Sequence, residues 1–130
     1  MTDRYRQITE TVLIISGQDP RQCMACGKCT ASCPAYEHMN YHPHQFVSLV
    51  KKGKSHMLLD DTSIYHCLSC YACAERCPRG VEPVKLIEAI RLLALREKGA
   101  NRLTPDAVSQ LLDDEMPQQV LVSAFRKYSK

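Results

Sequence analysis

The sequence lacks the features that identify several common classes of protein. No uninterrupted apolar run in the 130 residues approaches the roughly 18 that would cross a membrane, so we expect no transmembrane segment. Neither the glycine-rich fingerprint of dinucleotide-binding proteins nor a P-loop occurs. No nucleophile has an evident base partner. We therefore predict that this chain carries no catalytic residue.

A concentrated basic region is also missing. The formal net charge is +3, but the Lys and Arg residues are spread along the chain, which argues against a nucleic-acid partner. There is no helix pair with a basic recognition face. The first ten residues, MTDRYRQITE, contain no apolar signal segment, so we expect a cytoplasmic protein. In that compartment thiols remain reduced and disulfides do not persist.

What the chain does contain is a duplicated cysteine pattern. All eight cysteines fall in two runs, CMACGKCTASCP starting at Cys23 and CLSCYACAERCP starting at Cys67. Each cysteine of the second run lies 44 positions after its counterpart, as 67 minus 23 shows for the first pair. The shared spacing C-x2-C-x2-C-x3-C-P is the ligand pattern of bacterial [4Fe–4S] proteins. We therefore predict two [4Fe–4S] clusters as the cofactors.

The fourth cysteine of each run is expected to serve the cluster of the other run. Three closely spaced thiolates hold one cluster, and the proline after the fourth cysteine turns the chain away toward the second. The predicted ligands of the first cluster are Cys23, Cys26, Cys29 and Cys77. The predicted ligands of the second cluster are Cys67, Cys70, Cys73 and Cys33.

Zinc and disulfides are the two other interpretations of eight cysteines. Structural zinc sites usually take C-x2-C pairs, which would leave the third cysteine of each run without a function. An even number of cysteines permits a disulfide framework, but such frameworks belong to oxidising compartments. The doubled motif favours iron–sulfur clusters over both.

The apolar periodicity predicts an all-α fold. A helix over residues 4–16 would bury Tyr5, Ile8, Val12 and Ile15, and Phe46 lies in a second helix over 43–52. A strong helix is predicted over 83–98, a shorter one from 104 to 112, and an apolar terminal helix from about 117. In the spacer 35–66, β-branched residues do not alternate with polar ones and no Asn-Gly turn occurs. Both absences argue against a small β-rich ferredoxin.

We expect one compact domain over residues 1–130, with the clusters completing its core. Its predicted parts are an N-terminal helix over 1–18, a two-cluster core over 19–83 and a helical C-terminal region over 84–130. The terminal helix has an apolar strip containing Leu121, Phe125 and Tyr128. That strip needs cover, either from its own domain or from a partner protein.

Glycine and histidine residues near the cysteines are candidate contributors to the site. Gly27 follows Cys26 directly, and a residue without a Cβ lets the backbone approach a cluster sulfide. His38, His42 and His44 raise the possibility of another metal site, but Pro43 interrupts their helical spacing and eight cysteines already satisfy two clusters. His66 adjoins Cys67 and could tune the cluster potential through a hydrogen bond.

The chain resembles the C subunit of heterodisulfide reductase. The resemblance lies in the two runs CMACGKCTASCP and CLSCYACAERCPRGVEP, in the helical spacer and in the helical tail. The resemblance implies an α-helical ferredoxin domain, similar to the iron–sulfur domain of succinate dehydrogenase. It also implies a non-catalytic subunit that relays electrons between a flavin-containing A-type subunit and a catalytic B-type subunit that handles the disulfide. The Cys-Cys-Gly repeats that resemble the catalytic site of the B-type subunit are absent from this chain.

Two other functions fit the cysteine runs. One is the iron–sulfur subunit of a fumarate reductase-like or glycolate oxidase-like complex, which would keep the relay and change the partners. The other is a redox sensor or a cluster scaffold, which would need a different attached module. Copurification with the partner proteins distinguishes them.

Overall fold

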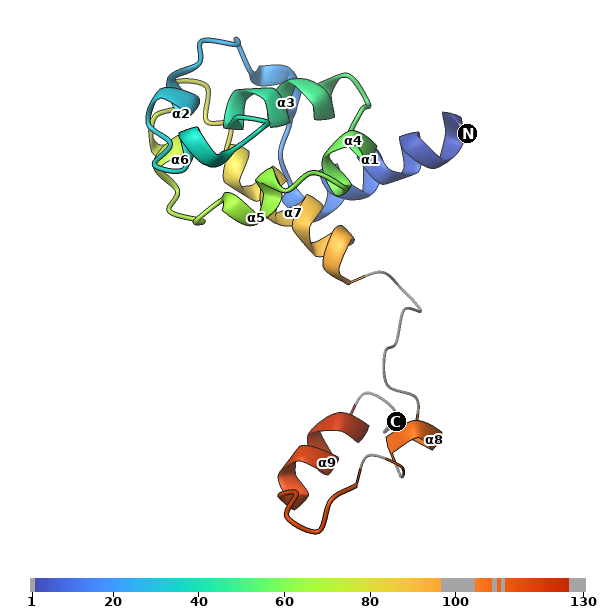
Figure 1. Cartoon of the computed structure of the whole chain (residues 1–130). Coiled ribbons are helices and arrows are strands. Elements are labelled where there is room, and N and C mark those ends of the chain that lie inside the picture. The colour runs from blue at the N-terminus through green and yellow to red at the C-terminus, as the bar shows by residue number, and fades with distance from the viewer. Residues whose placement is uncertain (1, 97–104, 109, 111, 127–130) are drawn as a thin grey trace. The chain divides into compact units, whose positions relative to one another are not determined.

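The structure is a computed structural model that describes residues 2–96, 105–108, 110 and 112–126. The chain divides into two compact units, Met1–Glu97 and Lys98–Lys130, each described here by itself. All regular elements of the described residues are helical, which confirms the predicted all-α fold (Figure 1). The α-helices of the first unit are α1 Thr2–Ser16, α2 Lys28–Ala31, α3 Pro43–Lys51, α4 His56–Leu59, α5 Ser63–His66, α6 Ala72–Glu75 and α7 Pro83–Leu95, and its 3-10 turns are η1 Pro20–Gln22 and η2 Tyr36–His38.

Helix α7 is the centre of the first unit. It contacts α1, α3, α4, α5 and α6, and it lies beside α1 in Figure 1. Its sequence is apolar around most of its circumference, and Leu86, Ile87 and Ile90 are almost completely buried. A helix that is apolar on all sides is stable only when neighbours cover every face. Pro83 begins the helix at a position where the missing N–H costs no hydrogen bond.

Helix α1 packs against α7 through a face that differs in one residue from the predicted one. Val12 is completely buried, as expected, but Ile15 is 42% exposed and Ser16 is buried in its place. The prediction for Ile15 is therefore wrong. With 100° of rotation per residue, position 16 lies about 40° from position 12, whereas position 15 lies about 60° away on the other side. The buried stripe of α1 therefore continues from Val12 to Ser16, four residues later, and not to Ile15.

Polar side chains link α1 to distant segments. The Thr9 hydroxyl donates to the Ser55 hydroxyl over 2.9 Å in the buried interior. Gln18 binds Glu82 twice, donating from Nε2 to the carboxylate and accepting from its backbone N–H, both at 3.0 Å. These bonds join the end of α1 to the start of α7. They thereby position the chain as it enters the first cysteine run.

Helix α3 covers another side of α7 and separates the two cysteine runs in sequence. Phe46, Val47 and Val50 are buried. The backbone N–H of His42 donates to Gln45 Oε1 over 2.8 Å at the N-terminus of the helix. Gly53, with φ of +71°, ends it in a left-handed conformation that glycine adopts without strain.

The second unit contains α8 Pro105–Val108 and α9 Gln118–Phe125. Several apolar residues of α9 face solvent: Val120 is 50%, Val122 67% and Phe125 38% exposed. Tyr128, which belongs to the predicted apolar strip, lies outside the described residues.

Most predicted helices agree with the observed ones to within a few residues. The helix predicted over 83–98 is α7, which ends at Leu95 with Arg96 as its C-cap, and the following residues are outside the described part of the chain. Helix α7 belongs to the first unit, although it begins the predicted C-terminal region 84–130. The single-domain organisation and its internal boundaries stay predictions.

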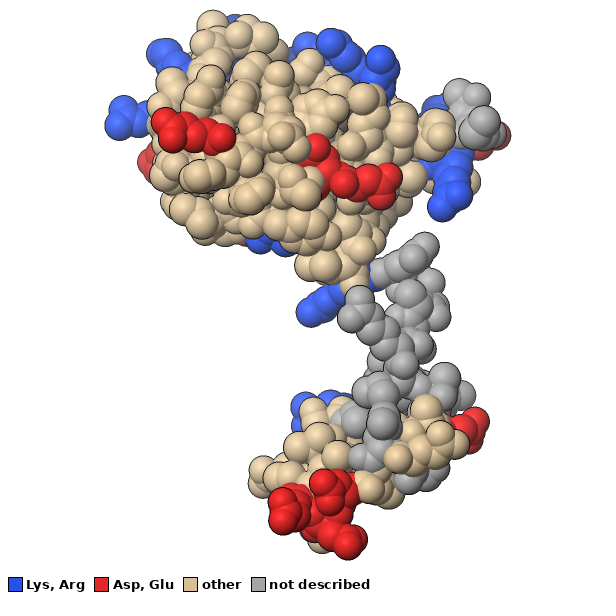
Figure 2. Space-filling model, in the orientation of Figure 1, with Lys and Arg blue, Asp and Glu red and all other residues tan. Residues whose placement is uncertain are grey.

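Among the described residues, no helix is both long enough and apolar enough to cross a membrane. Figure 2 shows one face of the first unit, where the surface is largely uncharged and the Lys and Arg side chains lie mainly toward the margins.

Candidate iron–sulfur sites

The two cysteine runs fold into loops with the same unusual backbone. Ala25 and Gly27 have φ of 57° and 77°, and the residues 44 positions later, Ser69 and Tyr71, have φ of 51° and 62°. Left-handed conformations are rare for residues with a side chain, and alternating them turns a short loop inward. Each loop therefore curls around a centre and leads into a one-turn helix, α2 or α6. Three of these four residues bear a Cβ, so this curvature is maintained at a cost in backbone strain.

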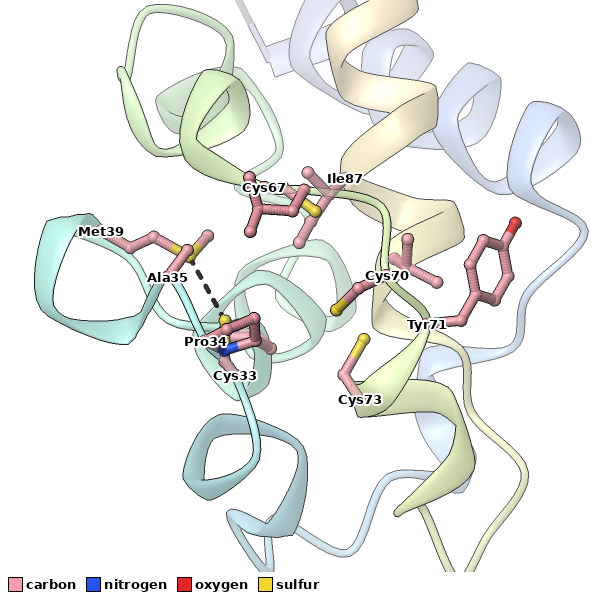
Figure 3. A pocket seen from close by; sticks show the side chains of 12 residues that line it. Cys33, Pro34, Ala35, Met39, Cys67, Cys70, Tyr71, Cys73 and Ile87 are labelled. Atoms are coloured by element: carbon pink, nitrogen blue, oxygen red, sulfur yellow. Dashed lines mark hydrogen bonds between the residues drawn. The ribbon is translucent and has the colours of Figure 1, made fainter.

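The loop of the second run surrounds a cavity that we call the Cys33 cavity. In Figure 3 the cysteines labelled around it are Cys67, Cys70 and Cys73 of the second run and Cys33 of the first. The Cys33 thiol also contacts the Met39 sulfur at 3.9 Å. The remaining lining residues are Pro34, Ala35, Met39, Pro43, Leu68, Tyr71, Val84 and Ile87.

The loop of the first run surrounds a second cavity, the Cys77 cavity. Three of its cysteines, Cys23, Cys26 and Cys29, come from the first run, and the fourth is Cys77. The two cavities have similar empty volumes of about 340 and 350 Å³, including the part open to solvent. The remaining lining residues are Met24, Gly27, His44, Val47, Pro78, Arg79, Val81 and Pro83.

Each predicted cysteine therefore lies on a cavity with three others, in the groups that the sequence predicts. Helices α2 and α6 are in contact, which brings the fourth cysteine of each run to the cavity of the other. The assignment of individual cysteines to clusters stays a prediction. Eight thiols around two mainly apolar cavities nevertheless form a donor set that suits two [4Fe–4S] clusters, whose ligands are cysteine thiolates.

Burial makes some of these cysteines poor thiolates in the absence of metal. Desolvation raises the pKa of the Cys73 thiol to about 11, and it also raises the pKa values of Cys29 and Cys33. Cys26 and Cys70 are exposed. Metal ligands must be deprotonated, so binding at the buried cysteines displaces protons. The exposed cysteines mark where each cavity approaches solvent.

Arg91 of α7 holds the start of the second run. Its guanidinium donates to the carbonyl of Ile64 from Nε and to the carbonyl of Cys67 from a terminal nitrogen, both over 2.8 Å. Hydrogen bonds from a charged donor are stronger than neutral ones, and the planar guanidinium fixes two acceptors at once. The position of Cys67 is therefore tied to the central helix.

Thr30 and His44 hold the first run against α3. The Thr30 hydroxyl lies 2.6 Å from His44 Nδ1, and the same hydroxyl accepts the backbone N–H of His44 over 3.2 Å. His44 also lines the Cys77 cavity. The imidazole is thus positioned beside the first cysteine run by a residue adjacent to Cys29.

The other histidines near the cysteine runs have different surroundings. The His42 ring stacks on Tyr36 with 4.2 Å between ring centroids, and the rings of His38 and His66 are 6.2 Å apart. Within the described part of the chain, no three His, Cys, Asp or Glu side chains converge closely enough to hold a single metal ion.

Sequence reasoning missed three residues that the structure associates with the site. Arg91 gave no local signal, because its acceptors are 24 and 27 residues away. Tyr71 and Arg79 line the two cavities, and the offset of 44 pairs them with Gly27 and Ala35. That offset, applied to whole runs and not only to the cysteines, would have found them.

Comparison with known proteins agrees with this geometry. Residues 19–81 match the family model of the 4Fe-4S dicluster domain. The C subunit of the ferredoxin:CoB-CoM heterodisulfide reductase of Methanosarcina mazei is 38% identical over 101 residues, which cover 78% of this chain and 62% of that protein. The C subunit of the ferredoxin/F420H2-dependent CoB-CoM heterodisulfide reductase of Methanosarcina acetivorans is 37% identical over 86 residues, or 66% of this chain and 53% of that protein.

A third relative is the C subunit of the H2:CoB-CoM heterodisulfide,ferredoxin reductase of Methanothermobacter thermautotrophicus. It is 30% identical over 86 residues, which cover 66% of this chain and 46% of that protein. The chain thus spans less than two thirds of the length of each of these relatives. Taken together, the cysteine geometry, the domain match and these relatives identify the chain as a two-[4Fe–4S]-cluster iron–sulfur protein homologous to the C subunits of heterodisulfide reductases.

Proposed function

We propose that this chain is the electron-transfer subunit of a cytoplasmic heterodisulfide reductase-like complex. It relays electrons between a flavin-containing subunit and a catalytic subunit that handles a disulfide or another sulfur compound. No substrate chemistry takes place on this chain. The observation that supports the proposal most directly is the pair of four-cysteine cavities, each lined by three cysteines of one run and one of the other.

The chain's residues provide what a relay requires. [4Fe–4S] clusters supply one-electron chemistry without making or breaking bonds to a substrate. The crossed arrangement makes both sites depend on contact between α2 and α6, so the two sites are held in one rigid unit. Burial of Cys73 and of the aliphatic side chains around it limits solvent access on the inner side. The exposed Cys26 and Cys70 bring each site to the surface, where a partner can exchange electrons.

The partners are inferred from the relatives. Those proteins are named as C subunits of heterodisulfide reductases, and a C subunit belongs to a larger complex. Because each site approaches solvent through its own exposed cysteine, Cys26 or Cys70, two partners can exchange electrons with the chain at different places. We propose that an A-type flavin subunit and a B-type catalytic subunit each dock beside one of the two sites.

Metal and sulfide analysis of anaerobically purified protein tests the cofactor assignment. We expect about eight iron and eight acid-labile sulfide per chain, four of each per cluster. Stoichiometric zinc without sulfide would overturn the proposal, because a relay of this kind requires iron–sulfur clusters.

Copurification tests the complex. The tagged chain, purified from its native host under anaerobic conditions, should retain an untagged flavin-containing protein and an untagged disulfide-handling protein. Reduction of the bound flavin should then reduce the clusters of this chain within the complex. Copurification with a fumarate reductase-like or glycolate oxidase-like flavoprotein, in place of a disulfide-handling protein, would move the relay to another complex.

A further inference from the structure

The two cluster sites are built from corresponding residues, which allows them to be compared position by position. Nine residues of each cavity lining are related by the offset of 44. Seven of these pairs keep the same character: four pairs of cysteines, one pair of prolines, and the apolar pairs Met24 with Leu68 and Met39 with Pro83. The two remaining pairs differ in kind, Gly27 with Tyr71 and Arg79 with Ala35.

The first of these pairs differs in the size of the side chain. At the first position Gly27 leaves the loop uncovered, since a Cβ there would have no neighbour within 4 Å. Its counterpart Tyr71 adopts the same left-handed conformation, with φ of 62°, although this strains a residue with a side chain. Tyr71 is 38% exposed, and in Figure 3 its ring lies beyond Cys70 and is directed away from the cysteines of the Cys33 cavity, so it does not cover that site.

At the second position the contrast is one of charge. Arg79 is exposed and lines the Cys77 cavity directly after the Cys77-Pro78 pair. Its counterpart Ala35 is only 6% exposed and lines the Cys33 cavity directly after Cys33-Pro34. The imidazole of His44 is a further polar group on the Cys77 cavity. No charged side chain and no imidazole belongs to the described lining of the Cys33 cavity.

We propose that the difference between Arg79 and Ala35 sets the order in which the clusters accept electrons, with the Cys77 site reduced first and the Cys33 site second. The inference depends on the proposed two-cluster function. Adding one electron makes a cluster site one unit more negative. A nearby cation and access to water stabilise that added charge and raise the reduction potential, whereas apolar cover lowers it. Arg79 is therefore a positioning residue that raises the reduction potential of its own site, whereas Ala35 adds no charge at the other site.

The experiment is an anaerobic redox titration of the full chain with dithionite, followed by electron paramagnetic resonance, after iron and sulfide have been measured for each variant. We expect two one-electron steps of different midpoint potential. Arg79→Ala should lower the higher midpoint and leave the other in place. Arg79→Lys keeps the positive charge, so its higher midpoint should stay close to that of the unaltered protein. The matched control is Arg76→Ala, because Arg76 is also exposed but lines neither cavity.

Specific results would overturn the inference. Two equal midpoints, a shift of the lower midpoint by Arg79→Ala, or an equal effect of Arg76→Ala would each do so while leaving the two-cluster function intact. A protein without iron and sulfide would overturn the proposed function and this inference together.

Discussion

Replacing Arg91 by methionine should destabilise the first unit and release the cluster beside Cys67 before the other. The guanidinium makes two charge-assisted hydrogen bonds of 2.8 Å to backbone carbonyls of Ile64 and Cys67. A hydrogen bond to a charged group contributes about 1.5–3 kcal/mol, and removal of the donor leaves its acceptor unsatisfied. Arg91 is only half-buried, so water can replace part of the lost hydrogen bonding. We therefore expect the free energy of unfolding to fall by about 3 kcal/mol, which is the lower end of the range for two such bonds.

A loss of this size is easily measured. For a unit of this length 1 kcal/mol changes the melting temperature by about 4–8 °C, so Arg91→Met should lower it by about 12 °C or more. Anaerobic melts at one scan rate should be followed by far-ultraviolet circular dichroism and, in the same sample, by visible absorbance of the clusters. Electron paramagnetic resonance of partly heated samples then reports which cluster has been lost.

The control is Arg96→Met, since Arg96 is exposed at the C-cap of the same helix. That substitution should change the free energy of unfolding by less than about 0.5 kcal/mol. Arg91→Lys keeps the charge without the two-pronged geometry and should fall between the two. An Arg91→Met variant that melted within about 3 °C of the unaltered protein, or that lost both clusters at the same rate, would contradict this role of Arg91.

Three further predictions concern the crossed ligands, the core and the tail. Cys77→Ala should remove the cluster held by the first run and roughly halve the iron content, because the other cluster keeps all four of its predicted ligands, Cys67, Cys70, Cys73 and Cys33. Signal loss confined to the second run's cluster would mean that each run is self-contained. Leu86→Ala, in the completely buried centre of α7, should cost about 3 kcal/mol in the same melts. Leu92→Ala, at a position 39% exposed, is its control and should cost less than about 1 kcal/mol. A chain truncated after Glu115 loses α9, and it should keep both clusters but bind its catalytic partner more weakly. Unchanged partner affinity would refute docking by this helix, and joint loss of clusters and thermal stability would show that it completes the chain's own core.

The helices and the cluster pattern could be predicted because their causes lie within a few residues. Pro43 and Pro83 begin helices, and Gly53 ends one in a left-handed conformation. The spacing of the cysteines defines each loop as a cluster-binding unit, since three ligands of one cluster fit within a seven-residue turn. Such features depend on local backbone geometry, which neighbouring residues dictate.

Contacts between distant segments required the folded chain. The burial of Ser16 in place of Ile15 depends on the direction from which α7 approaches α1, and periodicity does not specify which of two adjacent rows of side chains the neighbour covers. Arg91 reaches Cys67 only because α7 packs beside α5, and its sequence neighbours give no sign of this. The inequality of the two sites arises from both sources. The differences between Gly27 and Tyr71 and between Arg79 and Ala35 are present in the sequence, but it is the crossing of the chain between α2 and α6 that assigns Arg79 to the same cavity as Gly27.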